Sequence, residues 1–217
     1  MKGCELVLSN EVYSALLNRL MNGELVPGQM INRRDIAESL GTSTAPVLEA
    51  MKQLEFDGYL ETIPRRGTQV KPITKEDLVG NYIARIGFEC MAVRMCITNK
   101  TLESRADILR SLSRQEEAIR KECGPSFAAW TADSEYHLAL VQSCGNARLF
   151  DEYRRIALPN LFYRQHHVMR DNPSRHPDDH LRLTEDLLKE TSPDTAEKRI
   201  RAHISSGISM VTSLLGD

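Results

Sequence analysis

Residues 27–71 of the chain read PGQMINRRDIAESLGTSTAPVLEAMKQLEFDGYLETIPRRGTQVK. Apolar residues recur at helical spacing in two parts of this stretch, which predicts helices at about residues 33–40 and 43–56. Gly41 separates the two helices, and a polar residue that can cap a helix precedes each of them. A short helix, a tight turn and a second helix form the pattern that is typical of a helix-turn-helix motif.

The residues on either side complete a compact unit. Residues 59–63 and 68–71 are rich in β-formers and flank a turn at 64–67 that contains glycine, so they predict a hairpin. Upstream, residues 9–22 have helical periodicity, and we expect Ser9 to cap that helix. Three helices followed by a β-hairpin form a winged helix-turn-helix.

The chain changes character after residue 72. Thr74 and Asp77 have the spacing of a capping box, which predicts the start of a long helix that continues to about residue 99. Further helices are expected at about residues 102–122, 125–144, 147–168, 176–191 and 193–215. We therefore predict a mainly α protein with a winged helix-turn-helix DNA-binding domain at 1–72 and an all-α antiparallel helical bundle at 73–217.

The composition excludes several classes of protein. Hydrophobic residues make up 41% and charged residues 27%, as in a globular protein. No apolar run approaches the ~20 residues that span a bilayer, and no signal segment is recognisable at the N-terminus. The five cysteines form no C-x-x-C pair and are expected to be reduced. We expect a cytoplasmic protein that does not span a membrane.

The candidate DNA-binding residues lie at three places in the first domain. The second helix of a helix-turn-helix enters the major groove with its N-terminal residues facing the bases, and a basic turn suits a wing at the minor groove. The candidates are Arg33, Arg34, Ser43, Thr44, Arg65, Arg66 and Gly67. Residues 1–72 hold eight Lys and Arg against nine Asp and Glu, so any positive charge that contacts DNA has to be local.

The candidate metal ligands lie in the second domain. Asp133 and His137 are spaced i, i+4 in the middle of an apolar helical face, and His180 and His203 share the apolar faces of two later helices. A buried carboxylate is costly unless it is paired or binds a metal. Three imidazoles and one carboxylate suit zinc, nickel, manganese or iron. His166 and His167 are adjacent, so at least one is expected at the surface.

The first domain resembles the DNA-binding domain of the GntR family of transcriptional regulators. The residues that carry the resemblance are Pro27-Gly28, the run from Ile36 through Ser43, Pro46-Val47, Glu49-Ala50, Leu54-Glu55, Asp57-Gly58-Tyr59 and Arg66-Gly67. The resemblance continues into the second half of the chain. It implies the FadR subfamily with an FCD effector-binding domain, in the smaller VanR-like group.

The family resemblance implies roles for several residues. Arg34 matches a family arginine that contacts DNA, whereas Thr44 and Leu48 stand where family members usually have arginine. In the second domain, Asp133, His137, His180 and His203 match the metal-binding pattern of FCD domains, whose metal helps to hold a small carboxylate.

Arg85 and Glu89 also match family positions and leave two interpretations open. They can form an i, i+4 helix ion pair, or Arg85 can bind the carboxylate of the effector.

We therefore predict a ligand-responsive transcriptional repressor, and not an enzyme. It would bind a palindromic operator in double-stranded DNA as a homodimer, with half-sites about one turn apart. One alternative is a metal-dependent hydrolase-type enzyme, although we expect no glutamate beside the ligands to act as a general base, and the chain has no G-x-S-x-G motif. The other is a regulator that has lost sequence-specific DNA binding and acts through protein contacts, which Thr44 and Leu48 leave open.

Overall fold

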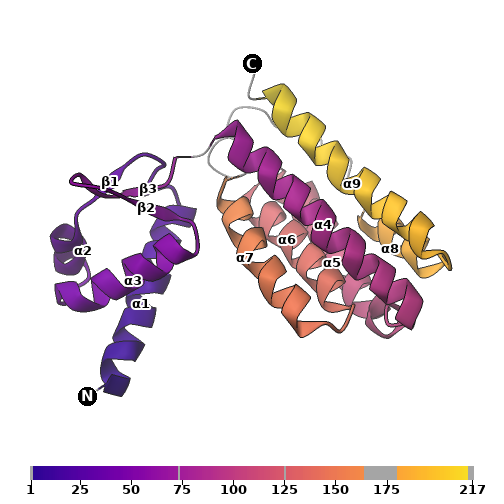
Figure 1. Ribbon diagram of the computed structural model, residues 1–217, viewed down its shortest axis with the longest axis horizontal. Helices are drawn as coiled ribbons and strands as arrows, with labels where there is room; N and C mark the ends of the chain where they lie inside the picture. The colour runs from indigo at the N-terminus through magenta and orange to yellow at the C-terminus, as the bar shows by residue number, and fades with distance from the viewer. Residues whose placement is uncertain (1, 73, 125, 164–179, 215–217) are drawn as a thin grey trace. The chain divides into compact units, whose positions relative to one another are not determined.

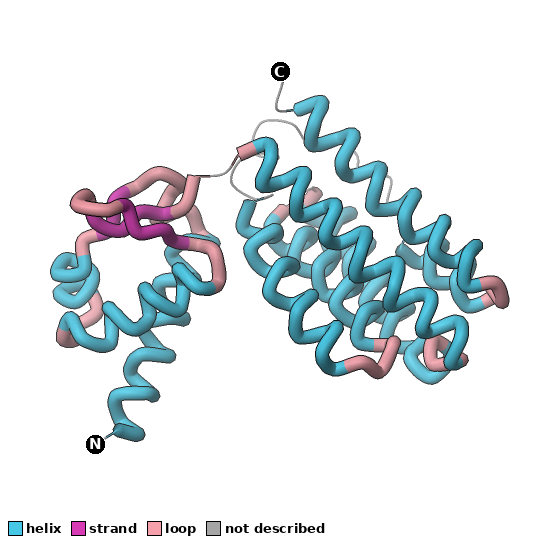
Figure 2. Tube along the Cα trace, viewed as in Figure 1, coloured by secondary structure: helices cyan, strands magenta, loops and turns pink. Residues whose placement is uncertain are grey.

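The computed structural model describes residues 2–72, 74–124, 126–163 and 180–214. It divides into two compact units, Met1–Ile73 and Thr74–Asp217, so the division falls one residue beyond the predicted boundary. The predicted class, a mainly α protein with an N-terminal winged helix-turn-helix and a helical C-terminal part, is confirmed (Figures 1 and 2).

The first unit packs its helices around a small apolar core. Its elements are α1 (Lys2–Met21), β1 (Met30–Ile31), α2 (Arg33–Ser39), α3 (Thr44–Phe56), β2 (Leu60–Ile63) and β3 (Gly67–Val70). Leu16 and Leu20 of α1 are fully buried with Val47 and Leu54 of α3, and α1 contacts α3 more than any other element of this unit. Asn32 caps α2 as predicted, because its side chain accepts a hydrogen bond from the backbone N–H of Arg34.

The first unit contains a short strand, β1, that the sequence did not predict. It extends the hairpin of β2 and β3, which forms the wing, to a sheet of three strands. β3 pairs antiparallel with β2, as expected for the hairpin, and also with β1, so the strands lie in the order β1-β3-β2. The β1–β3 register places Met30 opposite Gln69 and Ile31 opposite Thr68. A strand of two residues is too short to show the alternation by which strands are recognised in a sequence.

The tip of the wing depends on two residues with positive φ. Arg65 has φ +66° and Gly67 has φ +110°. A Cβ atom on Gly67 would lie 3.3 Å from the Cε atom of Met30, so glycine serves both the backbone conformation and the close approach of β1.

One predicted helix start was wrong. Ser9 lies inside α1, which begins at Lys2, and its side chain is buried rather than placed at a cap. Residues 4–8 contain no proline or glycine, so nothing in the local sequence stops the helix from extending beyond Ser9 toward the N-terminus.

The second unit is a bundle of helices. They are α4 (Lys75–Asn99), the short 3-10 helix η1 (Glu103–Arg105), α5 (Ala106–Cys123), α6 (Phe127–Gln142), α7 (Ala147–Tyr163), α8 (His180–Leu188) and α9 (Pro193–Leu214). α4 runs antiparallel to α9 along one face (Figure 1). α6 contacts α4, α5 and α7, and α8 contacts α5 and α9.

The starts of these helices follow local rules. The capping box predicted at Thr74 and Asp77 is present, and Pro193 occupies the first position of α9, where its missing N–H costs little. Pro125, which we expected at the start of α6, lies outside the described residues, and Ser126 caps that helix. None of the helices described combines the length and the apolar character that a bilayer crossing requires.

Leu140→Ala should destabilise the second unit by about 2–5 kcal/mol, because Leu140 is fully buried and truncation leaves a cavity. Urea unfolding followed by fluorescence of Trp130, the one tryptophan of the chain, measures this unit. Ile108→Ala, at a residue 45% exposed in α5, is the control and should change the free energy of unfolding by less than about 1 kcal/mol. Equal losses in both variants would contradict the core assignment.

Candidate metal centre and nucleic-acid interface

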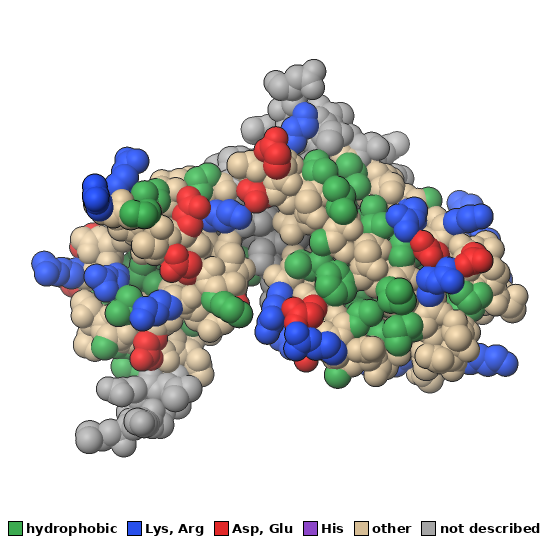
Figure 3. All heavy atoms as spheres, in the orientation of Figure 1, with side chains coloured by type: hydrophobic (Ala, Val, Ile, Leu, Met, Phe, Trp, Pro, Cys, Tyr) green, Lys and Arg blue, Asp and Glu red, His purple; other side chains and the backbone are tan. Residues whose placement is uncertain are grey.

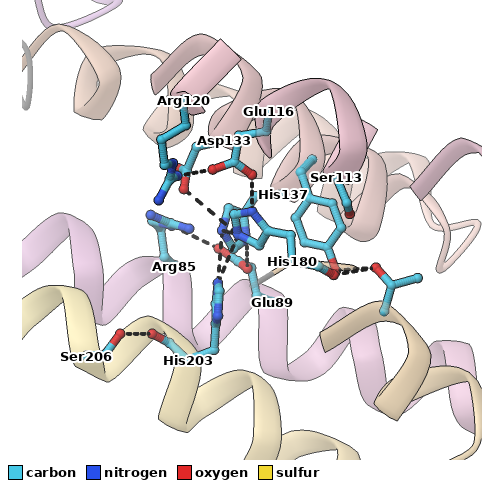
Figure 4. A network of polar contacts seen from close by, with 12 residues as sticks. Arg85, Glu89, Ser113, Glu116, Arg120, Asp133, His137, His180, His203 and Ser206 are labelled. Carbon is cyan, nitrogen blue, oxygen red and sulfur yellow. Dashed lines mark hydrogen bonds and ion pairs between the residues drawn. The ribbon is translucent and has the colours of Figure 1, made fainter. Parts of the chain in front are cut away.

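Three histidine side chains meet inside the second unit, one each from α6, α8 and α9 (Figure 4). The Nε2 atom of His180 lies 3.2 Å from that of His137 and 3.1 Å from that of His203. The Nε2 atoms of His137 and His203 are 3.4 Å apart. His137 and His180 are buried and His203 is half-buried. The helices thus bring together three predicted metal ligands, for which helical periodicity by itself gave only an inward direction.

Asp133 lies beside this point. It is one helical turn before His137 on α6, and its Oδ1 atom lies 3.9 Å from Nε2 of His180. Its side chain is buried. Ligand atoms of the three histidines lie within 4.8 Å of one another, and so do those of Glu116, Asp133 and His180. The predicted ligands Asp133, His137, His180 and His203 therefore lie in one cluster.

Carboxylates occupy the far side of two of the imidazole rings. Nδ1 of His137 lies 2.6 Å from Oε2 of Glu89, and Nδ1 of His180 is hydrogen-bonded to Glu116. A neutral ring that donates its Nδ1–H to a carboxylate presents the lone pair of Nε2 on the other side. These two carboxylates thus favour the tautomer in which both rings direct Nε2 into the cluster.

The role of these carboxylates corrects an expectation from the sequence. We expected no glutamate beside the ligands to act as a general base; Glu89 and Glu116 do contact ligand histidines. Both contacts are on Nδ1, the side away from the converging Nε2 atoms. The sequence signal that could have identified Glu116 is its position on a buried helical face. Glu116 follows Leu109 by seven residues and Ser113 by three, and all three residues are buried.

Further groups balance the charge of these buried carboxylates. Oε1 of Glu89 accepts hydrogen bonds from Nε of Arg85, at 2.9 Å, and from the hydroxyl of Tyr153, at 2.7 Å. Arg120 forms an ion pair with Glu116. Burial would raise the pKa of Glu89, but His137 and Arg85 outweigh it and hold that pKa at about 2. Glu89 is therefore ionised at neutral pH.

Burial acts on the histidines in the opposite direction. It lowers the pKa of His137, and it lowers that of His203 to about 2, with further lowering from the neighbouring His137 and His180. Burial thus favours the neutral form of His137 and His203, which is the form that binds a metal.

The spacing of the three nitrogens fits a metal ion. Zinc binds histidine nitrogen at about 2.0–2.1 Å, which places two such nitrogens of a tetrahedral site roughly 3.3 Å apart. The observed separations are 3.1–3.4 Å. Lone pairs that converge in a buried site repel one another unless a proton or a cation lies among them. The residues present therefore fit a divalent transition metal.

Arg85 forms an i, i+4 ion pair with Glu89, which is one of the two interpretations that the sequence left open. Its side chain is buried, it is bound to Glu89 within α4, and its guanidinium lies 5.6 Å from the centroid of the Tyr82 ring. His166 and His167 lie outside the described residues.

The predicted DNA-contacting residues lie at the surface of the first unit. Arg33, Arg34, Ser43, Thr44, Arg65, Arg66 and Gly67 are all exposed. Ser43 precedes α3 and makes no capping hydrogen bond through its side chain. A groove of about 600 Å³ runs between α3 and the wing. Arg33 from α2, Lys52 from α3 and Arg66 from the wing line it together with one acidic residue, Glu55, so basic side chains outnumber acidic ones here despite the acidic balance of the unit.

Comparisons with known proteins agree with both units. Residues 8–70 match the family of bacterial regulatory proteins named gntR, and residues 82–206 match the FCD domain. The uncharacterized HTH-type transcriptional regulator BphR of Paraburkholderia xenovorans is 27% identical over 94% of this chain and 85% of its own length. The uncharacterized HTH-type transcriptional regulator YdhC of Bacillus subtilis is 34% identical, over 50% of this chain and about half (49%) of its own length.

A solved structure shares the fold. The crystal structure of a putative GntR transcriptional regulator from Rhodococcus sp. RHA1 has a TM-score of 0.73 and 22% identity, and the likeness covers 94% of this chain and 96% of that chain.

The metal-free protein should lose stability as the pH falls below about 6.5. The pKa of His203 is about 2 in the folded protein against an ordinary value of 6.5, so between these values the unfolded chain binds a proton that the folded one does not. Glu89, with a pKa of about 2 against 4.5, adds a loss of the same sign below pH 4.5.

Urea unfolding of chelator-treated protein between pH 8 and 5 measures this effect. His203→Gln should show a shallower fall in the free energy of unfolding between about pH 6.5 and 5. The same slope in both proteins would show that His203 does not remain neutral in the fold.

Proposed function

The chain belongs to the GntR family of bacterial regulatory proteins and carries an FCD domain, and we propose that it is a metal-containing repressor that a small carboxylate releases from its operator. Membership of this family makes the chain a transcriptional regulator with a helix-turn-helix DNA-binding domain and an effector domain. Its relatives are transcriptional regulators and not enzymes, which leaves the hydrolase alternative without support.

One part of this proposal is that the regulator represses transcription. A relative from Paenarthrobacter nicotinovorans is described as a probable D-xylose utilization operon transcriptional repressor, and it is 25% identical over 92% of this chain and 86% of its own length. A repressor competes with transcription by occupying DNA, which needs only the binding surface of the first unit. The second unit then has to lower DNA affinity when the effector binds.

The convergence of three Nε2 atoms carries the metal proposal. His137, His180 and His203, with Asp133, would hold a zinc, nickel, manganese or iron ion. Carboxylates on the Nδ1 atoms of His137 and His180 hold the rings in position, as outer-shell partners do in metal sites. When bound, the metal would supply an electrophilic centre with positions for an anionic ligand.

Charge beside the cluster supports a carboxylate as the effector. Figure 4 shows Arg85 and Arg120 on the side of the cluster where Asp133 lies. A carboxylate is bound best by a cation together with guanidinium groups. If it binds the DNA-free form more tightly, DNA must in turn weaken effector binding by the same factor.

A homodimer would present two α3 helices to a palindromic operator. α4 offers a surface for this contact, because Gly80, Ile83, Gly87 and Met91 share one stripe of the helix. Ile83 is 61% exposed and Met91 50%, and hydrophobic side chains gather over α4 in the second unit (Figure 3). Glycines with open space above them allow a second helix to approach closely.

Glu116→Gln should weaken metal binding by about 10- to 100-fold while leaving the four proposed ligands in place. Isothermal titration of chelator-treated protein with Zn²⁺, Ni²⁺, Mn²⁺ and Fe²⁺ measures the affinity. Glu117→Gln is the matched control, since Glu117 is the next residue of α5 and its side chain is 53% exposed. If the wild-type protein binds none of these ions, the metal proposal fails; if Glu116→Gln binds as tightly as Glu117→Gln, only the role of Glu116 fails.

The regulator should bind DNA from just upstream of its own gene more tightly than a scrambled duplex, with two chains for each operator. Arg66→Ala should weaken binding and reduce its salt dependence by about one phosphate contact. Fluorescence anisotropy at several salt concentrations tests this, with Arg155→Ala, an exposed arginine of the second unit, as the control. Equal, weak binding to both duplexes would favour a regulator that acts through protein contacts.

A further inference from the structure

The exposed face of α3 differs from the rest of the DNA-binding surface in its chemistry. α3 is the second helix of the helix-turn-helix, the one that enters the major groove with its N-terminal residues facing the bases. One side of α3 is buried in the unit, through Pro46, Val47, Ala50, Met51 and Leu54. The other residues of α3 are exposed, apart from the half-buried Leu48; they are Thr44, Ala45, Leu48, Glu49, Lys52, Gln53, Glu55 and Phe56.

This face contains little that can bind guanine. A bidentate contact to guanine requires arginine or lysine. α3 contains no arginine, and its one lysine, Lys52, comes in the third turn. In the first two turns the groups that face outward are the methyl groups of Thr44, Ala45 and Leu48, with the hydroxyl of Thr44 and the carboxylate of Glu49.

Methyl groups match one feature of the major groove. Thymine alone presents a C5-methyl group there, and apolar side chains such as alanine and the methyl group of threonine contact it. The methyl groups of the first two turns of α3 are therefore complementary to thymine, and no side chain there offers the bidentate donors that arginine or lysine brings to guanine.

The surroundings of Leu48 suit this contact. Leu48 lines the groove between α3 and the wing together with Met30 of β1, whose side chain is 45% exposed. Arg33 and Arg66 line the same groove. The cations can bind phosphates, which provides affinity, while apolar side chains such as Leu48 contact the bases, which provides sequence selection.

We propose that α3 reads thymine methyl groups through Thr44, Ala45 and Leu48, so that the operator half-sites have T·A pairs where these residues meet the bases. This inference rests on the proposed binding of the chain to an operator. It also assigns a function to the positions at which Thr44 and Leu48 depart from the arginines of the family.

Removing single methyl groups from the DNA tests the proposal. Binding sites are first selected from random duplexes with the full-length protein. Each conserved thymine is then replaced by uracil, which removes only the C5-methyl group, and affinity is measured by anisotropy at a fixed salt concentration. One or more replacements in each half-site should weaken binding about three- to fivefold, as expected for one buried methyl group.

Variants assign the effect to α3. Leu48→Ala should abolish the difference between thymine and uracil at one position of each half-site, whereas Arg66→Ala should weaken binding equally to both DNAs. Phe56→Ala is the control on α3, because Phe56 is at its last position and 69% exposed, and it should keep the full thymine preference.

The outcomes separate this inference from the proposed function. Selected sites with thymines that matter to the wild type and not to Leu48→Ala would support the inference. Selected sites with conserved guanines and no response to uracil would overturn it and leave a DNA-binding regulator. Failure to select any sequence would overturn both and favour a role in protein contacts.

Discussion

The stability of the second unit depends on pairing the carboxylates that it buries with cations and hydrogen-bond donors. Glu89, Glu116 and Asp133 are nearly inaccessible to solvent, and an ionised carboxylate in such a place is strongly destabilising unless it is paired. In the described part of the unit, partners come from each of the α-helices α4 to α9: Arg85 from α4, Arg120 from α5, His137 from α6, Tyr153 from α7, His180 from α8 and, through the other histidines, His203 from α9. The helices are therefore joined by one polar network at their centre.

This network gives the effector domain a physical means to respond to a ligand. A metal and a carboxylate at the Nε2 side would contact residues from α6, α8 and α9 directly, and α4 and α5 through Glu89 and Glu116. α4 is also the helix that follows the wing along the chain. A ligand changes DNA affinity only if it binds two arrangements of these helices unequally, and a network that connects α4 to α9 allows a small shift at its centre to reach each of these helices.

The electrostatics of the first unit concern its surface and its attraction to DNA. Its residues carry nearly balanced charge, so its attraction to DNA cannot come from net charge. The arginines instead gather where α2 and the wing border the groove beside α3, and the first turns of α3 present small apolar groups. In the proposed mode of binding, such an arrangement would separate phosphate binding from base selection, so that a unit with few cations could bind DNA.

The sequence by itself determined the helices, the hairpin and the inward direction of Asp133, His137, His180 and His203, because these follow from periodicity and from caps such as Asn32 and Thr74, which act within a few residues. Only the tertiary structure decided which groups meet. β1 is recognised as a strand by its pairing with β3. Glu116 contacts a predicted metal ligand because the fold brings it to His180, 64 residues later in the chain. A helical stripe gives the direction in which a side chain points, but its partner depends on how the helices pack, and that packing is set by contacts far apart in the sequence.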